Sequence, residues 1–273
     1  MTKQMMVLIV VVLYVLFRSF FIEPNSIQVT KYQIEDNYLS GIRIAFLTDL
    51  HLKKHDFKRL DKIVELTNKN TPDIVLLGGD FANGHDYKKT MNMNIVAQKL
   101  NLINAPKYSV LGNHDWWANG ELITSSLELN GITVLENSSV RLRIKRTFLD
   151  IVGLADLTTR KPDITTALYR TSVPRIVLTH NHDVYYDIMD EVDLILAGHT
   201  HGGQFVIPFT PPLFVPSKYG SEFASGLIEN THNRMIISKG LGTSVVPLRF
   251  NCRPEIVIVN FVPVGSVQTE KKK

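Results

Sequence analysis

Five short apolar segments each run directly into polar residues of the kinds that bind metal ions. Such segments are typical of β-strands buried on both faces. The segments and the polar residues that follow them are 43–47 with Asp49 and His51, 74–77 with Asp80, 108–111 with Asn113 and His114, 176–178 with His180, and 194–197 with His199 and His201. Stretches with helical spacing, 57–67 and 91–100, separate the first three segments. The chain is therefore predicted to be an α/β protein with helices covering a sheet.

The polar residues after these strands are predicted to gather at one edge of the fold. In open α/β sheets, ligands bind beyond the carboxyl ends of the strands. A single His or Asp after a strand is usually a cap or a surface residue, but agreement among five strand ends favours a metal centre. The Asp-x-His and His-x-His spacings support it, because alternate residues of extended chain point to the same side. Cys252 is the only cysteine, so the metal must be held by His, Asp, Glu or Asn.

The pattern becomes richer in strands after Gly131, which predicts a second sheet, more antiparallel in character. The strand-like runs there are 133–135, 140–144, 148–153, 234–238 and 256–261. No internal repeat and no interdomain linker interrupts this region, so residues 41–262 are predicted to form one domain. Its expected architecture is two packed mixed β-sheets flanked by helices.

An apolar segment at the start of the chain predicts an N-terminal hydrophobic helix. Residues 5–17 are all apolar, and after Arg18 the run resumes until Glu23 and Pro24. A helix over 5–22 spans roughly 27 Å, enough for a bilayer core, with Arg18 able to reach the headgroups. Residues 1–22 are expected to be a retained anchor in the cell membrane, with a cleaved signal segment as the alternative. The exit Phe-Arg-Ser-Phe-Phe offers no small-residue cleavage site, which favours the anchor.

The remaining terminal segments carry little further information. Residues 23–40 are interpreted as a lead-in and 263–273 as a basic tail. The net charge of +4 is partly an effect of the three lysines in that tail. It is therefore weak support for nucleic-acid binding, and no nucleic-acid partner is expected.

The polar motifs also carry a resemblance to a known family. They read Asp49-Leu50-His51, Gly78-Gly79-Asp80, Gly112-Asn113-His114-Asp115, His180 and Gly198-His199-Thr200-His201. In this order and at these separations, over residues 42–204, the chain resembles the calcineurin-like metallophosphoesterases. The extension Gly202-Gly203-Gln204 and the hydrophobic amino terminus are similar to the bacterial membrane-linked branch of the YaeI and YkuE type. The resemblance implies a four-layer α/β/β/α sandwich.

Carried over to this chain, the resemblance implies a site with two divalent metal ions. The implied ligands are Asp49, His51 and His201 for the first ion, Asn113, His180 and His199 for the second, and Asp80 bridging both. This mixture of oxygen and nitrogen donors suits manganese, zinc or iron. Two cations roughly 3.5–4 Å apart clamp a phosphoryl group and make a bridging hydroxide available for in-line attack. His114 is implied as the catalytic residue that donates to the phosphoryl oxygen or the leaving group.

Two positions leave alternatives open in this site. In calcineurin a second aspartate, three residues after the bridging one, supports the catalytic histidine, whereas Asn83 stands at that place here. Asp115 or a backbone carbonyl is then expected to orient His114. His182 competes with His180 as a ligand, and His180 is preferred because it ends the apolar strand directly.

The aromatic and histidine residues near the motifs have plainer interpretations. The pair Trp116-Trp117 is expected either to bind substrate in a leaving-group pocket or to pack in the core. His55, His85 and His232 lie in polar stretches and are expected at the surface.

The resemblance implies hydrolysis of a phosphate ester. The expected substrate is a phosphodiester or pyrophosphate, and an anchor favours a lipid-linked one such as UDP-2,3-diacylglucosamine. A cyclic nucleotide or a phosphomonoester is the alternative substrate. A membrane-attached metal-binding scaffold is the non-enzymatic alternative. It is disfavoured because structural metal sites are normally closed, whereas His114 stands unused beside this one.

Overall fold

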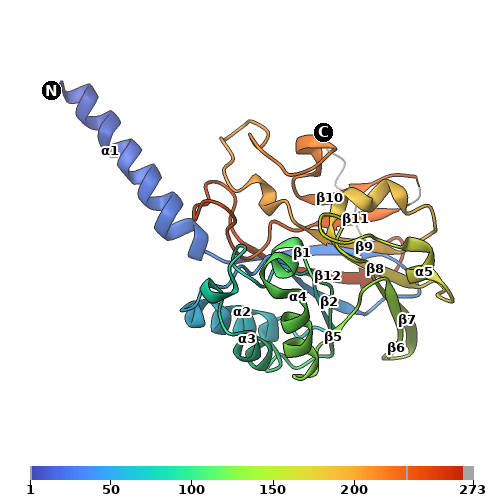
Figure 1. Ribbon diagram of the computed structural model, residues 1–273. Coiled ribbons are helices and arrows are strands. Elements are labelled where there is room, and N and C mark those ends of the chain that lie inside the picture. The colour runs from blue at the N-terminus through green and yellow to red at the C-terminus, as the bar shows by residue number, and fades with distance from the viewer. Residues whose placement is uncertain (1, 232, 267–273) are drawn as a thin grey trace.

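The computed structural model describes residues 2–231 and 233–266, which contain two six-stranded sheets (Figure 1). The strands of the first sheet lie in the order β1-β12-β2-β3-β4-β5. Their bounds are β1 Gln28–Glu35, β2 Arg43–Leu47, β3 Ile74–Leu77, β4 Lys107–Ser109, β5 Thr133–Val134 and β12 Glu255–Val262. Neighbouring strands are parallel except for the antiparallel pair β12 and β2. The first three predicted strands, β2 to β4, are therefore adjacent and point the same way.

The second sheet has the order β10-β11-β9-β8-β7-β6. Its strands are β6 Ser138–Ile144, β7 Thr147–Gly153, β8 Arg175–Asn181, β9 Leu194–Gly198, β10 Gly226–Glu229 and β11 Arg234–Ile237. The four central strands are parallel, and the pairs at the two edges, β10 with β11 and β6 with β7, are antiparallel. This sheet is thus more antiparallel than the first, but only at its edges.

Two runs that were expected in the second sheet belong to the first. The run at 133–135 supplies the edge strand β5, and the run at 256–261 supplies β12 between β1 and β2. β12 is apolar on both faces, because Val257 packs between the sheets while Ile258 packs beneath the helices. A strand that is apolar on both faces must be packed on both sides, and a position inside the first sheet, between the helices and the second sheet, meets this requirement.

The segment 23–40, expected as a lead-in, contributes a strand to the sheet. All eight residues of β1 pair in parallel with β12, from Gln28 opposite Glu255 to Glu35 opposite Val262. The packed sheets therefore begin before residue 41. Of the expected basic tail, residues 267–273 lie outside the described residues.

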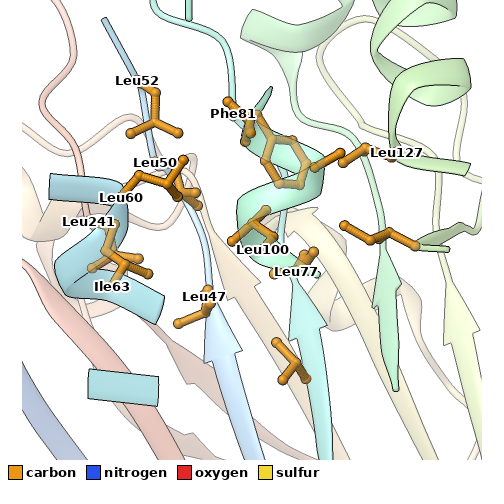
Figure 2. Packing of buried hydrophobic residues seen from close by; sticks show 14 of the residues in the cluster. Leu47, Leu50, Leu52, Leu60, Ile63, Leu77, Phe81, Leu100, Leu127 and Leu241 are labelled. Carbon is orange, nitrogen blue, oxygen red and sulfur yellow. The ribbon is translucent and has the colours of Figure 1, made fainter. Parts of the chain in front are cut away.

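Three apolar clusters arrange these elements in four layers. One cluster lies between the first sheet and its helices, one between the two sheets, and one on the outer face of the second sheet. Successive residues of a strand point to opposite faces, which explains why residues of β2 belong to different clusters. Ala45 and Leu47 face the helices, while Ile44 and Phe46 face the other sheet. Figure 2 shows the helix-side cluster, in which Leu47 of β2 and Leu77 of β3 lie below residues of the covering helices. The predicted sandwich of two mixed sheets flanked by helices is confirmed.

The two helical layers differ in how much helix they contain. The first sheet is covered by three helices, α2 Phe57–Lys69, α3 Met93–Leu100 and α4 Asn113–Glu128. The second is covered by the short α5, Ile164–Leu168, and by the 3-10 turns His182–Asp187 and Gly220–Phe223. The spacing of apolar residues predicted α2 and α3. α4 was not predicted, although it begins at two site residues.

The N-terminal apolar segment is helical, as predicted, and stands away from the sheets (Figure 1). α1, Lys3–Phe17, has no buried residue and continues through a π-helical turn, Arg18–Ile22, into a 3-10 turn, Glu23–Asn25. The whole helical segment is long and apolar enough to cross a membrane, a property that anchors and signal sequences share. The residues of α1 are not buried, whereas Ser19, Glu23 and Pro24 at the base of the segment are buried against the domain.

Candidate metal centre

All eight predicted site residues come together beyond the carboxyl ends of the central strands. Asp49 and His51 follow β2, Asp80 follows β3, Asn113 and His114 open α4, His180 lies at the end of β8, and His199 and His201 follow β9. The two sheets contribute from facing edges, so residues far apart in the chain become neighbours. Most of these side chains are buried, and His114 and His199 are half-buried.

Asp49, His51 and His201 form one group of converging side chains. His51 Nε2 lies 3.1 Å from His201 Nε2, and His201 Nε2 lies 3.4 Å from Asp49 Oδ1. The Asp49 carboxylate also accepts hydrogen bonds from the Thr48 hydroxyl, at 2.9 Å, and from the His199 backbone N–H. Every ligand atom of the group lies within 4.8 Å of the others, which is compatible with one shared metal ion.

Asn113, His180 and His199 form a second group beside the first. His180 Nε2 lies 3.1 Å from Asn113 Oδ1 and 3.2 Å from His199 Nδ1. The other ring nitrogen, His180 Nδ1, lies 2.8 Å from the backbone carbonyl of Gly78, which fixes the orientation of the ring. A metal-binding imidazole usually has such an outer partner.

Asp80 lies between the two groups. Its Oδ2 is 3.4 Å from His51 Nε2 in the first group and 3.4 Å from His180 Nε2 in the second. Its Oδ1 accepts a hydrogen bond of 2.9 Å from the backbone N–H of His114. One carboxylate therefore faces both groups while the first turn of α4 holds it in place.

Five of the eight site residues have a left-handed backbone: Asp49, His51, Asp80, His199 and His201. This conformation costs roughly 1–2 kcal/mol for a residue with a side chain and tends to occur at functional sites. The expectation that the Asp-x-His and His-x-His pairs lie on extended chain is therefore wrong. Sharp turns after β2 and β9 bring both members of each pair to the same side.

The protonation states of the cluster fit divalent cations. Burial lowers the pKa of His51 to about 3 and that of His199 to about 3, so both imidazoles keep a free lone pair at neutral pH. Burial also lowers the pKa of His180, but the Asp80 and Asp49 carboxylates outweigh it and raise this pKa above its usual value. Burial raises the pKa of Asp80, but the neighbouring histidines hold it below its usual value. A cation near Asp80 would take the place of the charge that a protonated His180 otherwise supplies.

His114 lies at the rim of the cluster. It belongs to neither group described above, although a ring nitrogen lies within 4.8 Å of ligand atoms of His51 and Asp80. Its Nε2 lies 3.4 Å from the hydroxyl of Ser244, and its ring meets that of His51 edge-on at 4.7 Å. Burial lowers the pKa of His114, and the Asp80 carboxylate and the Gly84 backbone act in the opposite direction.

Asp115 does not orient His114. Its carboxylate accepts hydrogen bonds from the backbone N–H groups of Asp80, Ala82 and Gly112, at 2.8 Å, 2.9 Å and 3.1 Å. The alternative of Asp115 as the support of His114 is therefore wrong. The residue instead ties the turn after β3 to the start of α4.

The geometry favours His180 over His182 as a ligand. His180 Nε2 has three candidate ligand atoms within 3.4 Å. His182 is also buried, but its Nε2 lies 3.1 Å from Asp183 Oδ1, and its ring centroid is 6.3 Å from that of His199.

A cavity of about 480 Å³ opens beside the cluster. Its floor includes Asp80, Asn113 and His199, and its walls are mostly apolar. The wall residues include Trp117, Phe214, Pro216, Val245 and Val246. The cavity thus combines a polar, metal-type floor with walls that suit an apolar group.

The two tryptophans have different places. Trp117 lines this cavity and stacks on His85, with ring centroids 4.3 Å apart and planes at 9°. Trp116 packs against the helix-side core and carries Arg160 over its ring at 3.7 Å. Only Trp117 therefore lies where substrate binding was expected. His85 is exposed, as predicted, but it belongs to the cavity wall; His55 is exposed, and His232 lies outside the described residues.

Sequence reasoning missed a glycine loop and a buried arginine. A Cβ on Gly240 would lie 2.6 Å from Asp49 Cβ, and one on Gly242 would lie 2.6 Å from His51 Cβ. The fully buried Arg249 donates to the backbone carbonyls of Gly240 and Gly242, and to that of His201. These contacts fix the backbone behind the first group. The Gly-Leu-Gly sequence directly after a strand was a usable signal for such a close approach.

Gly112 allows the two groups to come close together. A Cβ built on Gly112 would lie 2.2 Å from Asp80 Oδ1 and 2.7 Å from His180 Nδ1. We expect Gly112→Ala to displace the Asp80 carboxylate, to lower stability by about 1–3 kcal/mol, and to weaken metal binding. Thermal unfolding and metal titration of the variant measure both effects.

The control is Gly41→Ala, whose Cβ meets nothing within 4 Å although the backbone φ is +83°. That variant carries backbone strain alone, so its stability should fall while its metal affinity is unchanged. Unchanged metal affinity in Gly112→Ala as well would contradict the close-packing argument.

Comparisons with known proteins agree with this geometry. The profile of the calcineurin-like phosphoesterase family matches residues 42–203. The uncharacterized metallophosphoesterase YkuE of Bacillus subtilis (strain 168) is 30% identical over 250 residues, covering 87% of this chain and 86% of that protein. The phosphodiesterase YaeI of Escherichia coli (strain K12) is 30% identical over 253 residues, covering 88% and 90%.

Among solved structures, the sulfate thiohydrolase SoxB of Thermus thermophilus superposes with a TM-score of 0.50 at 13% identity. The match covers 74% of this chain and 52% of that one, and it speaks for the fold alone. The family profile, in contrast, spans the five strand ends that carry the His/Asp cluster. The chain is therefore a member of the calcineurin-like metallophosphoesterase family.

Proposed function

We propose that the protein is a phosphoesterase that binds two divalent metal ions. The observation that carries this proposal is the position of Asp80 Oδ2, at 3.4 Å from one histidine of each group. The proposed ligands are Asp49, His51 and His201 for one ion, Asn113, His180 and His199 for the other, and Asp80 for both. Manganese, zinc and iron suit this donor set. Ions bound there would supply Lewis-acid chemistry to the phosphoryl group.

The residues around the ions have separate proposed tasks. His114 donates a hydrogen bond from its imidazole to the phosphoryl oxygen or to the leaving group, since its ring lies at the cavity rim and outside both groups. Asp115 keeps the turn after β3 against α4, so that Asp80 and His114 hold their separation. Arg249 keeps the backbone of the first group in place through its carbonyl contacts.

We further propose that α1 is a retained membrane anchor, so that the enzyme works at the cell membrane. The exposure of the helix along its length supports this, because a helix of that composition is normally covered by protein or lipid. The burial of Ser19 and Glu23 at its base supports retention over cleavage, since a cut before residue 23 would separate part of the packed base.

The proposed substrate is a phosphodiester or pyrophosphate attached to a lipid, for example UDP-2,3-diacylglucosamine. The apolar walls of the cavity support an acyl-bearing substrate, with Trp117 and Phe214 beside the metal-type floor. The name of the Escherichia coli relative, a phosphodiesterase, supports a diester over a monoester.

The test compares catalytic efficiency on UDP-2,3-diacylglucosamine with that on its deacylated counterpart, using the detergent-solubilised full chain with manganese. Each buried acyl methylene contributes about 0.8 kcal/mol, so two buried carbons already favour the acylated substrate by roughly an order of magnitude. Equal efficiency on the two would contradict the lipid-linked substrate and favour a cyclic nucleotide or a monoester. Absence of hydrolysis of any phosphate ester by the metal-loaded protein would favour the scaffold alternative.

A further inference from the structure

Two loops that contribute residues to the lining of the active-site cavity, at 205–217 and 243–250, expose apolar side chains. We call these side chains the mouth surface: Phe209, Leu213, Phe214, Val245 and Val246. Phe209 and Val245, at the tips of the two loops, are fully exposed. Soluble proteins rarely expose large apolar side chains in such a group, and a group of this kind usually marks an interaction site.

Both loops are tied to the base of α1. The backbone N–H of Arg249 donates to the Ser19 carbonyl at 3.0 Å, and the Arg18 guanidinium lies 5.8 Å from the centre of the Phe250 ring. Phe250 in turn pairs with Phe205, and their rings stack with centroids 5.2 Å apart. The loops therefore leave the domain beside the point from which α1 projects (Figure 1).

Cationic side chains lie next to the mouth surface. Arg18 stands where α1 meets the domain; it pairs with the buried Glu23 at 3.3 Å and stays partly exposed. The exposed Lys53 lines a cavity of about 410 Å³ together with Val245 and Val246. Apolar tips flanked by Lys and Arg are the pattern of a surface that rests on anionic headgroups.

We propose that the mouth surface docks on the bilayer into which α1 inserts, so that the active-site cavity opens onto the headgroup layer. This rests on the proposed anchor but not on hydrolysis. A bilayer crossed by α1 begins at the base of that helix, where both loops lie. Lipid is therefore the partner that reaches the mouth surface without any further component, and the phosphate of a lipid-linked substrate would meet the metal ligands without leaving the membrane surface.

The test places a fluorophore on the loop tips of the full chain. Phe209→Cys and Val245→Cys are each labelled with an environment-sensitive dye and reconstituted into vesicles of phosphatidylethanolamine and phosphatidylglycerol. Vesicles with and without doxyl-labelled lipids give the quenching. The unlabelled parent, whose Cys252 is buried, gives the background.

The matched control is Leu129→Cys, an exposed apolar position that caps the far end of α4. It lies at the opposite end of α4 from Asn113 and His114, beyond a kink at Asn119. Side chains that enter the headgroup and acyl boundary should be quenched by at least about twofold more than this control.

Quenching above the control at both loop tips supports the proposal. Quenching at either tip that does not exceed the control overturns it, and so does failure of the protein to float with the vesicles. A rise in dye emission without lipid quenching identifies a protein partner or a second copy and also overturns it. None of these readings depends on catalysis, so they stay distinct from a failure of the proposed hydrolase.

Discussion

Replacing Asp80 with alanine is expected to remove bound metal and hydrolysis together. Its carboxylate lies between the two groups, with Oδ2 at 3.4 Å from a histidine of each. The loss of activity should exceed the roughly 10–100-fold that follows from changing an outer partner of a metal ligand. Elemental analysis of the purified variant and an assay with a chromogenic phosphodiester measure the two losses.

Asp150→Ala is the matched control. Asp150 is also a buried aspartate, but it pairs with Arg141 at 2.7 Å and lies level with the start of β8, at the opposite edge from His180. That variant should unfold at a lower temperature while keeping its metal content. Full metal occupancy in Asp80→Ala would refute the bridging role.

His114→Asn is expected to keep the metals and to slow turnover by about 10²–10⁴-fold, the typical contribution of a positioned proton donor. The contact between this residue and Asp80 uses the backbone N–H of His114, which asparagine retains. Metal analysis and the turnover number of the same preparation therefore separate catalysis from metal binding.

The control for this variant is His55→Asn, an exposed histidine in the loop after β2. It should match the parent in both metal content and turnover. Undiminished turnover in His114→Asn would remove His114 from the catalytic step, whereas loss of metal would place it among the ligands.

Much of the site follows from the sequence because its residues lie at the ends of apolar strands. A run such as 74–77, apolar at every position, has to lie inside a sheet, and the chain must then turn at its end. Because the strands are parallel, the polar residues at those turns lie together at one edge of the fold. This reasoning brought together residues as distant as Asp49 and His201 without knowledge of the sheet order.

The different positions of the two tryptophans could be predicted only by recognising α4, which the sequence analysis missed. Consecutive residues on an α-helix point about 100° apart, so Trp116 and Trp117 at the start of α4 cannot both face the same cavity. Recognition of α4 would have predicted one pocket residue and one core residue. The helix was missed because Asn113, at a strand end, was interpreted as the start of a loop.

The contacts that support the cluster from behind could not be predicted from the sequence, for a different reason. Asp115 is an aspartate like Asp80, and only the positions of backbone N–H groups show that Asp80 faces the histidines while Asp115 fastens a turn. Arg249 reads as a surface cation, yet it is fully buried among backbone carbonyls. Such roles depend on distances between segments that the sequence does not encode locally.

The pairing of β1 with β12 restricts the order in which the chain can fold, because the two strands are far apart in the sequence. The Glu23 carboxylate accepts the backbone N–H of Cys252, 229 positions away, and the neighbouring strands β1 and β12 continue the same seam. Closing a loop of that length carries an entropic cost of about 5 kcal/mol. During synthesis, β1 can pair with β12 only after the more than two hundred residues between them have been made. A truncation that removes β12 therefore deprives β1 of its partner strand and removes the Cys252 contact that holds Glu23 at the base of α1.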